Sequence, residues 1–244
     1  MVNKLSFVAL FIAFSFGNGL VIPEESLVPV EHFPFIVSIQ ENGQQFCTGS
    51  LISSRYVLTS ASCFDFIDTY DMQFIRVIAG ANRPNEEGLP RKIVGYSIHP
   101  KHSNTKVTYD AVLIELIGDY AFTDKIYPAS LVGETFEISP GARVNITGYS
   151  LNQDDSAPKI LRNAVVEIIE TKACQESWAK QTIHDQLLCA GNSEENIGSG
   201  DGGAPMTNQG DLVGYASVQS ENGGPSLFTK ISSIRPWIKE ITGV

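Results

Sequence analysis

Apolar residues occur in short runs along this 244-residue chain, and Gly, Pro, Asn or Asp separates most of the runs. The segment FPFIVSIQ (33–40) alternates in character and leads to Asn42-Gly43, a pair that favours a two-residue type I′ hairpin turn. The other strand-like runs include FCTGSLIS, RYVLTS, FIRVIAG (74–80), KIVGYSI (92–98), AVLIEL (111–116), ARVNIT (142–147), AVVEII (164–169), LVGYASV (212–218) and LFTKI (227–231). Many short strands between such turns predict an all-β fold, either a sandwich or barrels.

The end of the chain departs from this pattern and predicts a helix over 232–242. Apolar residues recur there at i, i+3, i+4 and i+7 and form one face: Ile234, Trp237, Ile238 and Ile241. We expect Ser232 or Ser233 to cap the helix and Pro236 to lie in its first turn. The apolar face, with Trp237, is expected to pack into the core.

The beginning of the chain predicts a secretory signal peptide over residues 1–19. Lys4 supplies a positive start, the apolar run LSFVALFIAFSF (5–16) follows, and Gly17 to Gly19 offer small residues for cleavage. A membrane anchor is the alternative, but the run is shorter than the ~20 apolar residues of a spanning helix. We therefore expect a secreted, extracellular protein with a mature chain over 20–244 and no membrane partner.

The chain carries 27 acidic and 17 basic side chains, which gives a formal net charge of -10. An acidic surface argues against nucleic acid, heparin or an anionic membrane as the main partner. Solubility alone would also explain the charge, since acidic secreted proteins are common. The sequence contains no repeat and no block of like charge, and we expect a monomer.

Four cysteines bear on both cross-linking and metal binding: Cys47, Cys63, Cys174 and Cys189. In a secreted chain four cysteines favour disulfides, and three pairings are open. The spacings do not match a CxxC zinc motif, and none of the histidines stands at ligand spacing from a cysteine. We therefore expect neither a metal site nor a cofactor.

Several segments of the chain resemble, in order, the landmark motifs of the trypsin-like serine proteases. They are FCTGSLISSRYVLTSASC (46–63), YDAVLIEL (109–116), NITGYS (145–150), LLCAG (187–191), GDGGAP (200–205) and PSLFTKI with the later WI (225–238). The likeness spans residues 22–242. It implies two six-stranded antiparallel β-barrels, over about 22–125 and about 126–231, followed by the helix. It also implies the disulfides Cys47–Cys63 and Cys174–Cys189.

The resemblance places three positions of the chain at the catalytic triad of these proteases. Ser62 stands in place of the histidine base, Asp110 matches the acid, and Gly202 stands in place of the serine nucleophile. Glycine has no side chain to form an acyl-enzyme, and a serine hydroxyl is a poor base at neutral pH. We expect no protease activity, and we expect Asp110 to remain as a structural residue hydrogen-bonded to Ser62.

Two histidines near this aspartate in the sequence are the candidates for a replacement base. His99 belongs to a His-Pro pair that the family places on the barrel surface, and His102 follows on a polar loop. Neither would replace the missing nucleophile, so a rescued protease is disfavoured. The backbone N–H groups of Gly200 and Gly202 could still form an oxyanion hole, but an oxyanion hole alone gives only a residual rate enhancement.

The specificity pocket of the family is altered at its base and at its entrance. Asn196 stands where a trypsin has the aspartate that attracts Arg or Lys, and Ser217-Val218-Gln219 replaces Ser-Trp-Gly. We expect Gln219 to project into the space that glycine leaves open and to block the pocket. A pocket reshaped for a small ligand is the alternative. The disulfide that braces this region in the family is missing at both ends.

Activation by cleavage is not encoded in its usual form. The segment at the expected new N-terminus, IPEE (22–25), follows Val21 rather than Arg or Lys. Asp201, which would pair with the new amine, therefore loses its usual cationic partner, and a buried carboxylate without one is costly. We expect the loop over 198–205 to take a zymogen-like course, with Asp201 hydrogen-bonded elsewhere.

These departures occur together, which indicates a natural pseudoenzyme rather than one inactivating substitution. The pattern is similar to the scabies mite inactivated serine protease paralogues, and that resemblance implies secretion and interference with host complement or other host defence. Host proteins, complement components among them, would then be the partners. The alternative is a competitor or cofactor that holds protease substrates or inhibitors without cleaving them, and a residual enzyme is a third class.

Two further segments are candidates for binding and for modification. The segment CFDFIDTYDMQF (63–74) interleaves aromatic residues with aspartates, which suits an anchor for a partner, although core packing explains aromatics as well. Asn145 begins an N-glycosylation sequon, NIT, on an expected strand, and is the glycosylation candidate.

Overall fold

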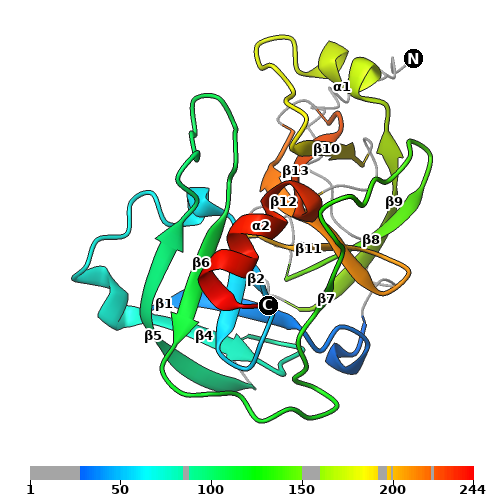
Figure 1. Ribbon diagram of the computed structural model, residues 1–244. Helices are drawn as coiled ribbons and strands as arrows, with labels where there is room; N and C mark the ends of the chain where they lie inside the picture. Colours follow the sequence, from blue (N-terminus) through cyan, green and yellow to red (C-terminus); the bar gives the residue numbers. More distant parts are fainter. Residues whose placement is uncertain (1–27, 85–87, 150–159, 192–196, 199, 221–222) are drawn as a thin grey trace, which may run out of the picture.

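The computed structural model describes residues 28–84, 88–149, 160–191, 197–198, 200–220 and 223–244. Two β-barrels lie side by side, and a C-terminal helix lies beside both of them (Figure 1). The signal peptide expected over 1–19 and the segment IPEE (22–25) lie outside the described residues. Within the described ranges, no helix is long and apolar enough to cross a membrane.

The first barrel is closed, with the strand order β1-β2-β3-β6-β5-β4 and antiparallel pairing throughout. Its strands are β1 (Ile36–Glu41), β2 (Gln44–Leu51), β3 (Tyr56–Thr59), β4 (Ile75–Ala79), β5 (Leu89–Ile98) and β6 (Val112–Leu116). Asn42 and Gly43, with φ angles of 50° and 80°, form the turn between β1 and β2. The Asn-Gly pair predicts this hairpin, because both central residues of a type I′ turn need positive φ.

The second barrel has the strand order β11-β8-β9-β10-β13-β12 and closes through the pairing of β11 with β12. Its strands are β8 (Arg143–Gly148), β9 (Arg162–Ile169), β10 (Leu187–Ala190), β11 (Pro205–Asn208), β12 (Asp211–Val218) and β13 (Ser226–Lys230). A short strand, β7 (Ser130–Leu131), adds to β12 in parallel, and a short helix, α1 (Thr171–Ser177), packs beside β10. The two six-stranded antiparallel barrels confirm the expected fold.

The C-terminal helix α2 (Ile231–Thr242) begins directly after β13. Its N-cap is Lys230, and no side chain caps the helix there, so the expectation that Ser232 or Ser233 is the cap is wrong. Because β13 continues to Lys230, no linker remains, and both serines fall within the first turn. Pro236 lies further inside the helix than the first turn, against expectation.

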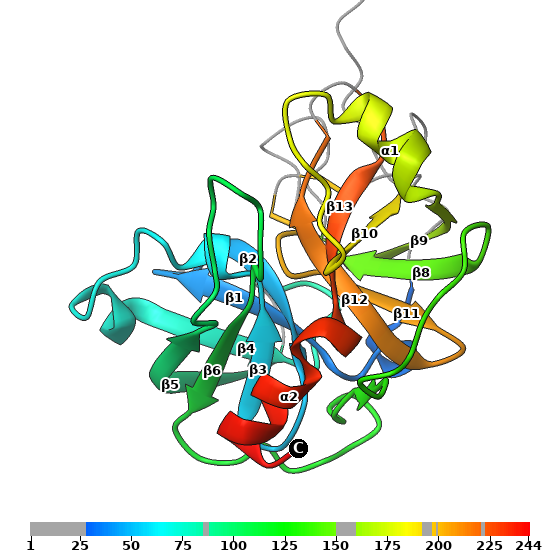
Figure 2. The same ribbon diagram turned by 45° about the horizontal axis from the view of Figure 1, so that its top comes forward.

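One face of α2 packs on β12 and β13, and the helix runs from the second barrel toward the first (Figures 1 and 2). Ile234, Trp237 and Ile238 are buried in the core, as their spacing predicts. Ile241 is 40% exposed, because the apolar face stops contacting the barrels before the last turn.

Apolar side chains fill each barrel, and the core of the second barrel continues across the junction to the first. Leu58 on β3 and Leu113 on β6 pack into the same cluster as Tyr215 on β12 and Trp237 on α2. This shared core fixes the edge of one barrel against the other. The polar cluster described next lies at this junction.

The four cysteines form the two disulfides that the family resemblance implies, Cys47–Cys63 and Cys174–Cys189. The first joins β2 to the turn after β3, and the second joins α1 to β10. No cysteine remains free, so none is available as a metal ligand.

Candidate functional site

Asp110, two residues before β6, is the centre of a polar cluster at the barrel junction. Its Oδ1 accepts hydrogen bonds from the backbone N–H of Ser62 (2.8 Å) and from the Ser62 hydroxyl (3.0 Å). Its Oδ2 accepts from the hydroxyls of Ser60 (2.7 Å) and Ser217 (2.6 Å). The buried carboxylate thus has four donors, three of them from the turn after β3 and one from the second barrel.

This arrangement brings three of the predicted site residues together. Ser62 lies beside Asp110 and hydrogen-bonds to it, as expected. Ser217, which the motif assigns to the entrance of the specificity pocket, directs its hydroxyl at Asp110. Ser217 lies where the pairing of β12 with β13 shifts register, between Ala216 and Val218, so the regular alternation of the strand does not predict its direction.

A buried tyrosine supports the same aspartate from the second barrel. The Tyr215 hydroxyl donates to the main-chain carbonyl oxygen of Asp110 at 2.8 Å. Burial, and then the negative charge of Asp110, hold the pKa of Tyr215 well above its usual range, so the phenol stays a donor.

His102, which the sequence offers as a candidate base on a polar loop, is a largely buried member of the cluster. Its Nε2 lies 3.3 Å from Oδ1 of Asp65, and its Nδ1 lies 4.0 Å from Oδ1 of Asp110. The imidazole is 9% exposed, and Nδ1 has no hydrogen-bond partner among the described residues. Asn104 accepts a hydrogen bond from the Ser62 hydroxyl (3.0 Å) and donates one to Asp65. No motif or spacing marks these contacts, which the course of the loop after β5 sets: the His102 side chain is largely buried there, and Asn104 is exposed.

The loop that carries His102 extends from the first barrel on the side that faces the second (Figure 2). A bridge between Ser103 and Thr108 closes it into a tight hairpin. Val107 at its end has a φ of 49° and packs against the apolar cluster of the second disulfide, as Trp178 and Val218 do. A β-branched residue rarely takes this left-handed conformation, so the packing across the junction compensates for a local cost.

His99 lies in the core rather than on the barrel surface, which corrects the expectation. Its ring stacks on Tyr109 with centroids 4.6 Å apart and meets Trp237 edge-on at 4.9 Å. Its Nδ1 accepts the backbone N–H of Lys101. Burial, with smaller effects from the charges of Lys101 and His102, lowers the pKa of His99 to about 4. A neutral, packed imidazole of this kind is a structural residue.

The glycine at the nucleophile position lies against the first disulfide. A Cβ on Gly202 would lie 3.1 Å from Sγ of both Cys47 and Cys63, and the Gly202 carbonyl accepts the N–H of Thr48 at 2.9 Å. The next residue is more constrained. Gly203 has a φ of 79°, and a Cβ there would collide with the Thr59 hydroxyl and the Thr48 carbonyl oxygen. Gly203 is therefore required by the fold, whereas Gly202 is not.

Asp201 is buried and accepts a hydrogen bond from the backbone N–H of Gly198 at 3.0 Å. Its carboxylate lies against Gly148, where a Cβ would collide with it. The amine expected at Ile22 lies outside the described residues, so the zymogen-like course stays a prediction.

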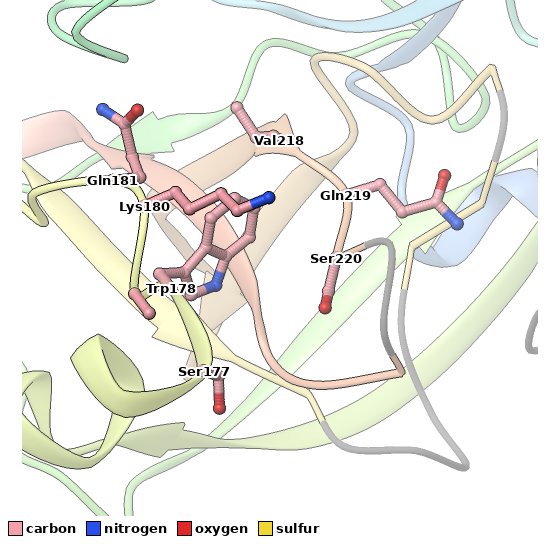
Figure 3. Close-up of a pocket in the computed structure, with 8 residues that line it drawn as sticks. Ser177, Trp178, Lys180, Gln181, Val218, Gln219 and Ser220 are labelled. Atoms are coloured by element: carbon pink, nitrogen blue, oxygen red, sulfur yellow. The ribbon is translucent and has the colours of Figure 1, made fainter.

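A pocket of about 360 Å³ lies between the segment after α1 and the end of β12 (Figure 3). Its walls include Trp178, Lys180, Gln181, Val218, Gln219 and Ser220. Gln219 is exposed, and its amide extends away from the Trp178 ring in this view. Asn196 lies outside the described residues, so the blocked specificity pocket also stays a prediction.

Asn145 lies on β8 and is partly buried, and its side-chain oxygen accepts a hydrogen bond from Asn163 at 3.0 Å. The hydroxyl of Thr147, the third residue of the sequon, is buried and bonds to the same Asn163. Glycosylation at Asn145 stays a prediction.

Comparison with known proteins agrees with this architecture. A family model described as Trypsin matches residues 22–238. Trypsin 5G1 of Aedes aegypti is 30% identical over 225 residues, which cover 89% of this chain and 83% of that protein. Trypsin delta of Drosophila erecta is 26% identical over 252 residues, which cover 96% and 98%.

Solved structures show the same fold. The scabies mite inactivated protease paralogue S-D1 matches with a TM-score of 0.81 and 24% identity, over 89% of this chain and 96% of that one. Mouse neuropsin, a serine protease, matches with a TM-score of 0.77 and 23% identity, over 88% and 97%. Since the family model also covers most of the sequence, the chain belongs to the trypsin family.

Proposed function

We propose that this protein is a secreted, catalytically inactive trypsin homologue that acts by binding other proteins. The observation that carries the proposal is the hydrogen bonding of Asp110. The Ser62 hydroxyl donates to Oδ1, where the family's mechanism needs an imidazole N–H, and the hydroxyls of Ser60 and Ser217 donate to Oδ2. Together with the glycine at position 202, this arrangement supports a structural rather than a catalytic role for Asp110.

Acyl transfer in this family needs a hydroxyl nucleophile and a base that takes its proton. The Ser62 hydroxyl is held between Asp110 and Asn104, both at 3.0 Å, so its proton is directed into the cluster. His102 lies 4.0 Å from Asp110, yet Gly202 offers no hydroxyl for it to deprotonate. A base without a nucleophile forms no covalent intermediate.

The loop over 99–108 also supports binding outside the former cleft. It holds His102 and Asn104 against the first barrel, and its Val107 packs against the apolar cluster around the second disulfide in the second barrel. An extended peptide entering between the barrels on this side would have to displace these contacts. Partners are therefore expected on outer surfaces of the molecule.

Host complement or another host defence is the proposed target. The support is the likeness to a structure named as a scabies mite inactivated protease paralogue, together with the coincident changes at Ser62 and Gly202. Two disulfides suit the proposed secretion.

The test is a complement lysis assay. Purified mature protein, over residues 20–244, is added to human serum, and lysis by the classical, lectin and alternative pathways is measured. A heat-denatured sample of the same protein is the control. We expect a dose-dependent loss of lysis in at least one pathway with the folded protein alone. Undiminished lysis in all three pathways would contradict the complement role.

A further inference from the structure

The segment Phe64–Phe74 exposes two large aromatic side chains. Phe66 is 93% exposed and Tyr70 is 68% exposed, the two highest values among the large apolar side chains described. The segment lies at the edge of the first barrel that faces away from the second (cyan in Figures 1 and 2). Neither the barrel core nor the polar cluster around Asp110 uses these rings.

The backbone that presents Phe66 is fixed from beneath. Phe64 is buried, with its ring 4.9 Å from that of Tyr96, and the Tyr96 hydroxyl donates to the carbonyl oxygen of Ile67 at 2.7 Å. The carboxylate of Asp68 accepts the N–H groups of Tyr70 (2.7 Å) and Asp71 (2.9 Å). The exposed rings are therefore displayed by an ordered turn.

Order in the free protein matters for binding. A segment whose backbone is already fixed loses less conformational entropy when a partner docks. Aromatic side chains are enriched among the residues that dominate protein interfaces, because they bury much area with few rotatable bonds. Phe66 and Tyr70 meet both conditions.

The charge of the segment indicates the kind of partner. Asp65, Asp68 and Asp71 lie in it, and the sequence over 56–75 contains no Lys or Arg. Among the described residues, Asp65 contacts the His102 ring and the Asn104 amide, and no ion pair neutralises Asp68 or Asp71. Like charges at an interface repel a partner of the same sign, and opposite charges speed and orient docking.

We propose that Phe64–Phe74 is the docking surface for a cationic protein partner, with Phe66 and Tyr70 as its apolar anchors. The inference rests on the proposed binding function and names the surface and the partner's chemistry. The partner presents an apolar depression bordered by Lys or Arg, which receives Phe66 while the basic side chains meet Asp68 and Asp71.

The test uses human serum and the whole mature protein. Immobilised wild-type protein captures serum proteins, and the affinity of the recovered partner is then measured for three variants. Phe66→Ala with Tyr70→Ala removes the anchors. Phe122→Ala with Tyr127→Ala is the matched control, because these rings are 48% and 56% exposed in the segment between β6 and β7. Asp71→Asn removes one charge and keeps the oxygen that accepts the Asp68 N–H.

We expect the anchor pair to weaken binding at least tenfold, the control pair to leave it unchanged, and Asp71→Asn to weaken it severalfold at low salt only. Unchanged thermal unfolding of each variant shows that the fold is intact. A benzophenone side chain placed at position 66 should cross-link to a partner segment rich in Lys and Arg.

The outcomes separate the surface from the proposed function. A serum protein that binds the wild type and the anchor variant equally would overturn the surface while leaving the binding function intact. Cross-linking to an acidic segment would overturn the partner's chemistry. If the wild type captures no serum protein, both the surface and the proposed function are contradicted.

Discussion

Gly202 and Gly203 are adjacent, yet the structure assigns them opposite tolerance to a side chain. At Gly202 a Cβ would lie 3.1 Å from Sγ of both Cys47 and Cys63, a tight contact that a shift of a few tenths of an ångström relieves. Overpacking of this size costs about 1–2 kcal/mol. We therefore expect Gly202→Ser to fold.

At Gly203 the same serine meets two obstacles. The φ of 79° costs a non-glycine residue about 1–2 kcal/mol, and the new Cβ collides with the Thr59 hydroxyl and the Thr48 carbonyl oxygen. We expect a loss above about 4 kcal/mol, a large part of the ~5–15 kcal/mol that stabilises a domain of ordinary stability. Urea unfolding followed by tryptophan fluorescence measures both variants.

Equal losses of free energy in the two variants would refute this account of the loop. The same Gly202→Ser protein also tests the chemistry, because it restores a hydroxyl beside a site that still lacks its base. We expect no hydrolysis of peptide substrates above that of the wild type. Turnover that appears with Gly202→Ser and disappears with the added change His102→Ala would show instead that His102 serves as a base.

Three further predictions address the residues that hold the site. Asp110→Ala should destabilise the fold by about 3 kcal/mol in urea unfolding, because it leaves buried hydroxyls without their acceptor. Asp110→Asn should cost less. If neither variant changes the free energy of unfolding, the structural role of Asp110 is contradicted. The pKa of His99 is about 4 when folded and about 6.5 when unfolded, so the unfolded state binds more protons between these values. Stability should therefore fall as pH drops through this window, by about 2 kcal/mol between pH 7 and 5, and the variant His99→Gln should lack this component of the fall. Replacing Cys174 and Cys189 together by Ala should cost about 3 kcal/mol for a loop of this length, which calorimetry at fixed pH measures.

The fold could be predicted because its signals are local and ordered. The Asn42-Gly43 turn, the strand-length apolar runs and the spacing of the family motifs each depend on residues close together in the sequence. The contact of Ser62 with Asp110 was also predictable, since the family's motifs place both residues at the same site.

The site predictions that were wrong or missing concern contacts between segments that are distant in the sequence. His99 is buried because Tyr109 and Trp237 pack on it, and Trp237 comes from α2 at the end of the chain. His102 lies 4.0 Å from Asp110 because of the course of the loop after β5, and no residue spacing encodes that course. The hydrogen bond of Ser217 to Asp110 was also not predicted, because Ser217 lies at a register shift between β12 and β13, where strand alternation gives no guide.

The most direct test of the central claim is the reaction of the folded wild-type protein, over residues 20–244, with a fluorophosphonate probe. The probe forms a covalent bond with an activated serine hydroxyl, and intact-mass spectrometry counts the adducts, with active bovine trypsin treated in parallel. We expect no adduct on this protein and one on trypsin, because Ser60, Ser62 and Ser217 direct their hydroxyls at Asp110 and position 202 has none. A stoichiometric adduct that depends on the folded state would contradict the account and show that the protein retains an activated serine.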